Sequence, residues 1–261
     1  MSLPISIITI CFNNLAELKS TCDSVDRQSL SPFEHWIIDG STNGEIRDFL
    51  ENHPQPSYRK WLSERDKGIA DAFNKGIQRA GGEILNMLNS GDCYYAADVL
   101  ELITKTFQNA PSITWLHGKC QTQRGGRDVI LGKPFEKEKL YRGMRSVWHQ
   151  TIFLKKELHH TYGLYDQKLN IAMDYDFLCR MAEEPFIFLE RQLVIFAPYG
   201  ISQTSYLASL RQMEQVYTKY FGKSLKLKLW HFRLRVLYYM LNGPLGKFLY
   251  AVKTRLKLEN M

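Results

Sequence analysis

Short apolar runs alternate with amphipathic segments through the first hundred residues of this chain. Four strands are predicted, from the apolar runs 5–12, 36–38 and 84–88 and from the segment 58–62, which is the third in chain order. After the first of them, Leu15, Leu18, Cys22 and Val25 recur at helical spacing. Nearly continuous apolar runs are typical of strands covered on both faces, and strands that alternate with helices pair in parallel. The pattern predicts a Rossmann-like α/β fold, doubly wound, with a mostly parallel central sheet and flanking helices.

Polar residues follow two of these predicted strands directly. Asp39 begins a turn-rich segment after the second strand, and Asp92 ends the segment 89–92 after the fourth. Asp39 alone is also compatible with a simple turn. Ligands of open α/β sheets bind outside the carboxyl ends of the strands, where a carboxylate suits a hard cation that neutralises a diphosphate. We therefore predict that Asp92 binds Mn²⁺ or Mg²⁺.

The segment 69–80 is predicted to be an amphipathic helix. Ile69, Phe73 and Ile77 share its apolar face, and Gly81 and Gly82 end it. A polar stripe runs along another face, comprising Lys67, Asp71, Asn74 or Lys75, and Gln78. This stripe faces either solvent or a ligand, and Asp66 is either a helix cap or part of the same site.

The alternation loosens after a predicted helix over 98–107. Residues 114–117, 129–131 and 148–154 are expected to form strands, as are 186–189 and 193–196. His149, within the third of these, is a candidate for the acceptor side of a second substrate, although a lone histidine there also fits a structural role. A helix is predicted from Met173, which places Asp174 and Asp176 near its amino end, where carboxylates are favoured.

Charge is divided unevenly along the chain. Residues 205–261 contain eleven Lys or Arg and two Glu, a net charge of +9, so the other residues sum to −2 of the total +7. Five cysteines are scattered without a CxxC spacing, and no secretory signal is evident, which favours a cytoplasmic protein.

The basic segment 205–261 is predicted to be helical and is rich in aromatic residues. Three interpretations fit it: an ordinary solvated helix, a nucleic-acid-binding face, or a face that lies on an anionic membrane surface. We expect peripheral association with the cytoplasmic membrane and no binding of nucleic acid. The predicted domains are 1–204, made of a nucleotide half (1–110) and an acceptor half (111–204), followed by the helical basic extension 205–261.

Five blocks of residues, in order, resemble the motifs of family 2 glycosyltransferases with the GT-A fold. They are Thr9 with Asn13, the segment 39–42, the segment 64–76, the segment 88–92 and the segment 174–176. The branch that they most resemble makes bacterial exopolysaccharides such as colanic acid. The resemblance covers roughly residues 4–198.

The resemblance implies a role for each matching residue. It assigns recognition of a nucleotide-sugar donor, with UDP as the favoured nucleotide, to Thr9, Asn13, Asp39, Gly40, Ser41, Asp66, Lys67, Asp71, Asn74, Asn89 and Ser90. It makes Asp92 the ligand of Mn²⁺ or Mg²⁺ and Asp174 the general base. The implied reaction is transfer of a sugar, with inversion, to a glycan or lipid-linked acceptor, and His149 and Asp176 are candidates for the acceptor side.

The chain departs from the family pattern at two positions. The family's metal motif presents two acidic residues, whereas here Gly91 precedes a single Asp92, and Met173 stands where many relatives have Glu. Two other functions are therefore considered: a nucleotidyltransferase that makes sugar nucleotides, and a catalytically silent sugar-nucleotide binding protein. The loop after the first predicted strand argues against the nucleotidyltransferase, since residues 11–15 contain neither glycine nor a basic residue to hold a triphosphate.

Overall fold

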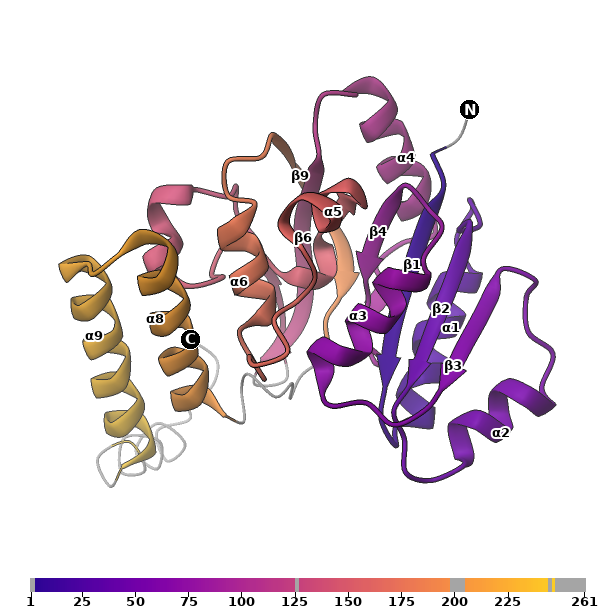
Figure 1. Ribbon diagram of the computed structural model, residues 1–261, viewed down its shortest axis with the longest axis horizontal. Coiled ribbons are helices and arrows are strands. Elements are labelled where there is room, and N and C mark those ends of the chain that lie inside the picture. Colours follow the sequence, from indigo (N-terminus) through magenta and orange to yellow (C-terminus); the bar gives the residue numbers. More distant parts are fainter. Residues whose placement is uncertain (1–2, 125–126, 198–204, 244–245, 247–261) are drawn as a thin grey trace.

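A computed structural model describes residues 3–124, 127–197, 205–243 and 246 (Figure 1). The first part alternates strands and helices as predicted: β1 (Ile5–Cys11), α1 (Leu15–Asp26), β2 (Glu34–Asp39), α2 (Glu45–Asn52), β3 (Arg59–Ser63), α3 (Ile69–Arg79), β4 (Ile84–Met87), β5 (Cys93–Tyr94) and α4 (Val99–Asn109). The second part contains β6 (Trp115–Arg124), β7 (Arg127–Leu131), the 3-10 helices η1 (Lys137–Arg142) and η2 (His149–Thr151), β8 (Phe153–Lys155), α5 (Glu157–Tyr162), α6 (Met173–Arg180), β9 (Phe186–Ile195), α8 (Tyr206–Phe221) and α9 (Leu225–Asn242).

One sheet runs through the molecule. Its strand order is β3-β2-β1-β4-β8-β6-β9-β5, with β7 paired to β6. The strands β3, β2, β1 and β4 are mutually parallel, and β8 is antiparallel to both β4 and β6. Because two reversals restore the direction, β6 and its parallel neighbour β9 run the same way as β4. The mostly parallel sheet predicted from the sequence is confirmed.

Helices cover both faces of the parallel strands because adjacent strand residues point to opposite sides. Ile8 and Ile38 pack with Phe73 of α3 on one face. On the other face Ile37 packs with Leu18 of α1, and Ile7 lies in the cluster that includes α4. The apolar runs of β1, β2 and β4 are nearly continuous because these strands are buried on both sides, whereas the edge strand β3 exposes Lys60 and Trp61.

The segment 148–154 differs from the strand that its apolar character predicts. Residues 149–151 form η2, and β8 begins only at Phe153. The residues of η2 come just before β8, which inserts between β4 and β6. His149 therefore lies on a turn beside the end of β4 rather than within a strand.

The helices α8 and α9 lie at the end of the molecule farthest from β3 (Figure 1). Val216 of α8 is buried in the same core cluster as Phe73, and Met213, Tyr217 and Tyr220 pack against that cluster. The segments before and after the predicted boundary at residue 205 therefore contribute side chains to the same hydrophobic core. Of the helices in the described ranges, none is both long enough and apolar enough to cross a bilayer.

Candidate active site

The loops that follow β1, β2 and β4 meet at one edge of the sheet. The three strands are parallel, and the last residue of β1, Cys11, is aligned with Asp39, which is aligned in turn with Ser63 of β3. Carboxyl ends of parallel strands leave a crevice where ligands bind. Most of the side chains predicted to bind the donor lie on the loops that leave the sheet at this edge.

Asp39 holds the loop after β2. Its carboxylate is buried; Oδ1 accepts a hydrogen bond from the Ser41 N–H (2.9 Å), and Oδ2 accepts one from Ser63 Oγ (2.7 Å). The Asp66 carboxylate lies against Gly40, so close that a Cβ at residue 40 would be 1.9 Å from Asp66 Oδ2. Only glycine at position 40 lets Asp66 reach this turn.

Asn13 joins the loops after β1 and β2. Its Oδ1 accepts from the N–H groups of Thr42 (3.0 Å) and Asn43 (3.3 Å), and its own N–H donates to Ser41 Oγ (2.8 Å). Asn13 adopts φ 52°, a region that asparagine tolerates better than most residues. The side chain is exposed at the mouth of the predicted donor site.

Two predicted donor ligands are turned into the protein instead. Thr9 is fully buried, and its Oγ1 is 2.9 Å from His35 Nε2. Asn74 is also buried, and its amide group donates to the Tyr165 carbonyl and accepts from the Tyr165 N–H, both at 2.9 Å. Direct contact of these two side chains with a donor is therefore not supported. Asn74 positions the loop around Tyr165, and Thr9 joins β1 to β2.

The start of α3 presents the other polar residues of the predicted stripe. Asp66 Oδ1 accepts from the Gly68 N–H (2.9 Å), which leaves the exposed Lys67 at the tip of the turn. Asp71 accepts from the Lys67 N–H (3.0 Å) and from Gln167 Nε2 (3.1 Å). Burial opposes ionisation of Asp71, but the Lys67 N–H and the nearby Lys75 more than offset it and lower its pKa.

A chain of side chains links the end of β4 to α6. Asn89 Nδ2 lies 3.1 Å from His149 Nε2, and His149 Nδ1 lies 3.4 Å from Asp174 Oδ2. An amide nitrogen can only donate, so His149 Nε2 accepts and the proton of a neutral ring is on Nδ1, facing Asp174. Asp174 Oδ1 accepts from the Tyr175 N–H (2.7 Å). Residues that are 60 and 85 positions from Asn89 thus form one cluster with it.

Asp92 lies beside this cluster and is almost completely buried. Its Oδ1 accepts from the Ala197 N–H (2.9 Å), whereas Oδ2 has no hydrogen-bond partner among the described residues. Burial raises the pKa of Asp92 to about 6, and the Ala197 N–H, His149 and the nearby side chains of Gln150 and Asn89 oppose that rise only in part. A buried carboxylate oxygen without a partner is costly unless a cation or a proton satisfies it.

These residues fit a divalent cation that is shared with a ligand. Within the described ranges there is no group of three or more His, Cys, Asp or Glu side chains that could hold a metal ion by themselves. Mg²⁺ typically uses one or two carboxylates and completes its coordination with phosphates and water. The unpartnered Oδ2 of Asp92 matches that requirement, provided that a diphosphate supplies the other ligands.

The backbone explains why glycine precedes Asp92. Gly91 has φ 98°, a conformation that side chains rarely adopt, so an acidic residue at position 91 would be strained. Thr21 of α1 holds this turn, since its Oγ1 accepts from the Gly91 N–H (2.9 Å) and donates to the Asp92 carbonyl (2.8 Å). Thr21 was missed because nothing in the sequence connects it to a turn 70 residues later.

Asp176 contacts side chains of two helices, α6 and α8. Its carboxylate is buried, accepts hydrogen bonds from Arg180 Nε (3.0 Å) and Tyr220 Oη (2.9 Å), and lies 3.2 Å from Lys219 Nζ. Tyr220 and Lys219 belong to α8. These contacts join α6 to α8, and they do not support the predicted acceptor role for Asp176.

Replacement of Asp176 with Asn is expected to lower the free energy of unfolding by about 3 kcal/mol, because the buried carboxylate of Asp176 is lost and the partly buried guanidinium of Arg180 loses its counter-charge. Turnover per folded molecule should be retained, which separates this residue from Asp174 two positions earlier. Urea unfolding and an activity assay on the same preparation measure the two quantities. A variant with normal stability but no turnover would show instead that Asp176 takes part in the active site.

The buried Asp92 carboxylate lies beside the pair of His149 and Asp174, at the carboxyl ends of the parallel strands. The glycosyl transferase family 2 model matches residues 6–164, and the chain belongs to this family of glycosyltransferases. An uncharacterised glycosyltransferase of Mycobacterium tuberculosis is 33% identical over 180 residues, 68% of each chain. A PGL/p-HBAD biosynthesis glycosyltransferase of Mycobacterium bovis is 29% identical over 213 residues, 76% of this chain and 79% of the relative.

Solved structures share the GT-A fold with this chain. Residues 1–349 of S. aureus TarS align with a TM-score of 0.67 and 16% identity, covering 94% of this chain and 77% of TarS 1–349. The mannosyltransferase PcManGT from Pyrobaculum calidifontis, solved with GDP-Man and Mn²⁺, aligns with a TM-score of 0.64 and 16% identity, covering 99% and 81%. TarS 1–349 has also been solved with UDP-GlcNAc.

Proposed function

We propose that this glycosyltransferase moves a sugar from a nucleoside diphosphate sugar, with UDP as the favoured nucleotide, to an acceptor hydroxyl with inversion at the anomeric carbon. The observation that supports this most is the pair formed by Asp174 and His149, beside Asn89 and Asp92. Asp92 and Asn89 are suited to a cation that binds a diphosphate, and Asp174 with His149 is suited to take a proton from the acceptor. Both pairs lie at the end of β4.

The donor half of the proposed site uses the loops after β1, β2 and β4. The exposed Asn13, the turn held by Asp39, and Asp66 against Gly40 border the proposed nucleotide site, and Lys67 is free to approach a phosphate. Asp92 and Asn89 would hold Mn²⁺ or Mg²⁺. When bound, the cation would neutralise the charge of the departing diphosphate.

The acceptor half uses Asp174 as the general base. Asp174 Oδ1 is occupied by the Tyr175 N–H, so Oδ2 is the oxygen available to take the acceptor's proton, and His149 Nδ1 orients it. The acceptor oxygen forms a bond to the anomeric carbon while the bond from that carbon to the diphosphate oxygen breaks. The electron pair leaves with the diphosphate. Attack from the side opposite the leaving group inverts the configuration.

The acceptor is proposed to be a glycan or a lipid-linked sugar in the synthesis of a surface polysaccharide. The M. bovis relative is named for PGL/p-HBAD biosynthesis, which supports a lipid-associated acceptor. We extend the proposal to an arrangement in which residues 1–110 bind the donor, residues 111–204 bind the acceptor, and residues 205–261 contact the cytoplasmic side of an anionic membrane.

A donor screen tests the proposal. The full-length protein is incubated with UDP-sugars and GDP-sugars, with Mn²⁺ or with EDTA, and release of the free nucleoside diphosphate is measured. We expect release from a UDP-sugar that depends on the cation. Binding of UDP without release from any donor would instead support a silent binding protein. Release of pyrophosphate from a nucleoside triphosphate and a sugar phosphate would support a nucleotidyltransferase.

A further inference from the structure

The helix α9 has two apolar faces, of which the core covers one. Leu227, His231 and Leu234 are buried against the rest of the protein. On the opposite face, Leu225, Leu229, Phe232, Val236 and Tyr239 follow one another at spacings of three and four residues. Their exposed fractions are between 38 and 72%. Nothing in the described part of the chain covers this outer face. Its apolar side chains form one continuous stripe, whereas an ordinary surface has apolar side chains scattered singly.

Basic residues flank the outer face of α9 on both sides. At 3.6 residues per turn, Lys226 and Arg233 lie on one side of the apolar stripe and Lys228 on the other, and all three are exposed. An apolar stripe between rows of cations is typical of a helix that lies in the interface of an anionic membrane. A second protein chain that has an apolar patch with an acidic rim could cover the same face of α9.

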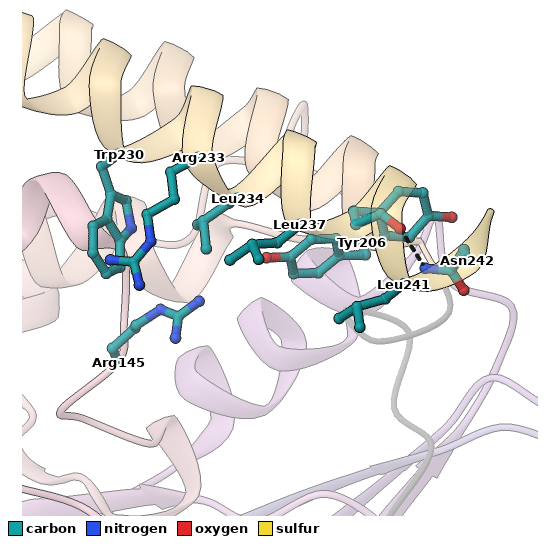
Figure 2. Close-up of a pocket in the computed structure, with 9 residues that line it drawn as sticks. Arg145, Tyr206, Trp230, Arg233, Leu234, Leu237, Leu241 and Asn242 are labelled. Carbon is teal, nitrogen blue, oxygen red and sulfur yellow. Dashed lines mark hydrogen bonds between the residues drawn. The ribbon is translucent and has the colours of Figure 1, made fainter. Parts of the chain in front are cut away.

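A groove next to this face contains the feature that favours a lipid. Figure 2 shows Arg145, from the loop before η2, on the same side of α9 as Trp230 and Arg233, with Leu237 and Leu241 further along the helix. The groove has a volume of about 490 Å³, and the residues that line it include two arginines and no carboxylate. It therefore has a cationic end and an apolar end.

Three guanidinium groups surround the Trp230 ring. The Cζ atoms of Arg142, Arg145 and Arg233 lie 5.2, 5.3 and 5.4 Å from the ring, and none of the three forms an ion pair with a described residue. Cation–π contacts contribute only about 0.5–1 kcal/mol each at exposed sites. The mutual repulsion of these charges favours a bound anion, and planar guanidinium groups bind phosphate in two-pronged fashion.

We propose that the groove at Trp230 binds the phosphate of an anionic membrane lipid, held between Arg145 and Arg233, with the acyl chains along Leu237 and Leu241 and the outer face of α9 in the interface. The inference rests on the membrane association proposed above and is independent of the transfer chemistry. Arg145 precedes His149 by four residues, so a lipid held there would place the acceptor half of the site next to the membrane surface.

The test is partitioning of the full-length protein into vesicles of phosphatidylcholine, with and without phosphatidylglycerol. Arg145→Ala/Arg233→Ala is compared with Lys226→Ala/Lys228→Ala, which also removes two positive charges, both of them from α9. If the charges acted only through the surface potential, each pair would cost about 30-fold. We expect the arginine pair to lose at least several-fold more affinity for the anionic vesicles than the lysine pair does. Equal losses would overturn the lipid site while retaining membrane association.

A second measurement tests the groove without any charge substitution. Soluble short-chain phosphatidylglycerol and inorganic phosphate are each titrated while tryptophan fluorescence is recorded, and Trp230→Phe identifies the signal of Trp230. We expect a saturable change with the lipid and none with inorganic phosphate at the same concentration. An equal response to phosphate would mean a site for free anions. A stable dimer in light scattering that is lost in Leu229→Ser/Phe232→Ser would mean that a second copy covers α9.

The outcomes separate this inference from the proposed function. A wild-type protein that binds no anionic vesicle removes membrane association and the lipid site together. Release of nucleotide from a donor in solution should be the same in the wild type and in both double variants, because neither pair lies in the proposed transfer site. If the wild type releases no nucleotide from any donor, that result would contradict the proposed transfer reaction and leave the lipid site unaffected.

Discussion

Replacement of Asp174 with Asn is expected to lower the turnover number by about 10³-fold while leaving the affinity for UDP unchanged. A general base contributes about 10²–10⁴-fold, and an amide oxygen takes up a proton too weakly to replace it. The substitution keeps the shape of the side chain and retains an acceptor for the Tyr175 N–H. Initial rates of UDP release in the presence of acceptor, together with calorimetric titration of UDP, measure the two quantities.

The histidine in contact with Asp174 provides a second arm of this experiment. His149→Gln keeps a donor toward Asp174 and is expected to lose less turnover than Asp174→Asn, because the carboxylate remains. Asp128→Asn, which removes an exposed carboxylate on β7, is the matched control and should behave as the wild type. An Asp174→Asn protein with normal turnover would remove Asp174 from the role of base, and a His149→Gln protein less active than Asp174→Asn would transfer that role to His149.

Replacement of Asp92 with Asn is expected to have opposite effects on activity and on stability. Activity with Mn²⁺ should fall by about 10²–10³-fold, because the charge that holds the cation beside the diphosphate is lost. The metal-free variant should nevertheless be more stable than the wild type at pH 7.5 by as much as about 3 kcal/mol, which corresponds to the rise of the Asp92 pKa from 3.8 to about 6.

The pH dependence distinguishes this explanation from a simple packing effect. In the unfolded chain the carboxyl group of Asp92 ionises near pH 4, whereas burial lets the folded protein keep the proton up to about pH 6. The folded state therefore binds more protons between these values, so the contribution of Asp92 to stability falls as pH rises from about 4 to about 6 and stays low above. The advantage of Asp92→Asn should grow over the same range.

Urea unfolding in EDTA at several pH values measures this advantage. The neighbouring Gln150 has a buried Oε1 without a hydrogen-bond partner among the described residues, which an amide at position 92 would satisfy. Asp128→Asn again serves as the control. A variant less stable than the wild type at pH 7.5 would show that the ionised carboxylate is satisfied in the fold, and full activity with Mn²⁺ would show that Asp92 does not hold the cation.

The first hundred residues were the most predictable part of this protein. The parallel strands β1, β2 and β4 are covered on both faces, so each contains a nearly unbroken apolar run, and α3 has a clear apolar side. The strand ends were predictable for the same reason, because the apolar run stops where the chain leaves the core. Asp39 and Asp92 were identified as candidate site residues by this change alone.

The structure departs from the sequence predictions where the direction of a side chain depends on distant contacts. Asn74 falls in the polar stripe of α3, yet it is buried against the backbone of Tyr165. Asp174 and Asp176 share one turn, but α8 packs beside the second of them and uses its charge. His149 was expected within a strand because its neighbours are apolar, although the insertion of β8 between β4 and β6 puts it on a turn.

The sequence by itself determined the class of fold and the positions where carboxylates leave the core, since both follow from local periodicity and from where it stops. Only the tertiary structure decided which of those side chains meet. It joined Asn89, His149 and Asp174, left Asp92 Oδ2 without a hydrogen-bond partner among the described residues, and placed Arg145 next to Arg233. Contacts between residues 25 to 88 positions apart depend on strand order and helix packing, which no local pattern encodes.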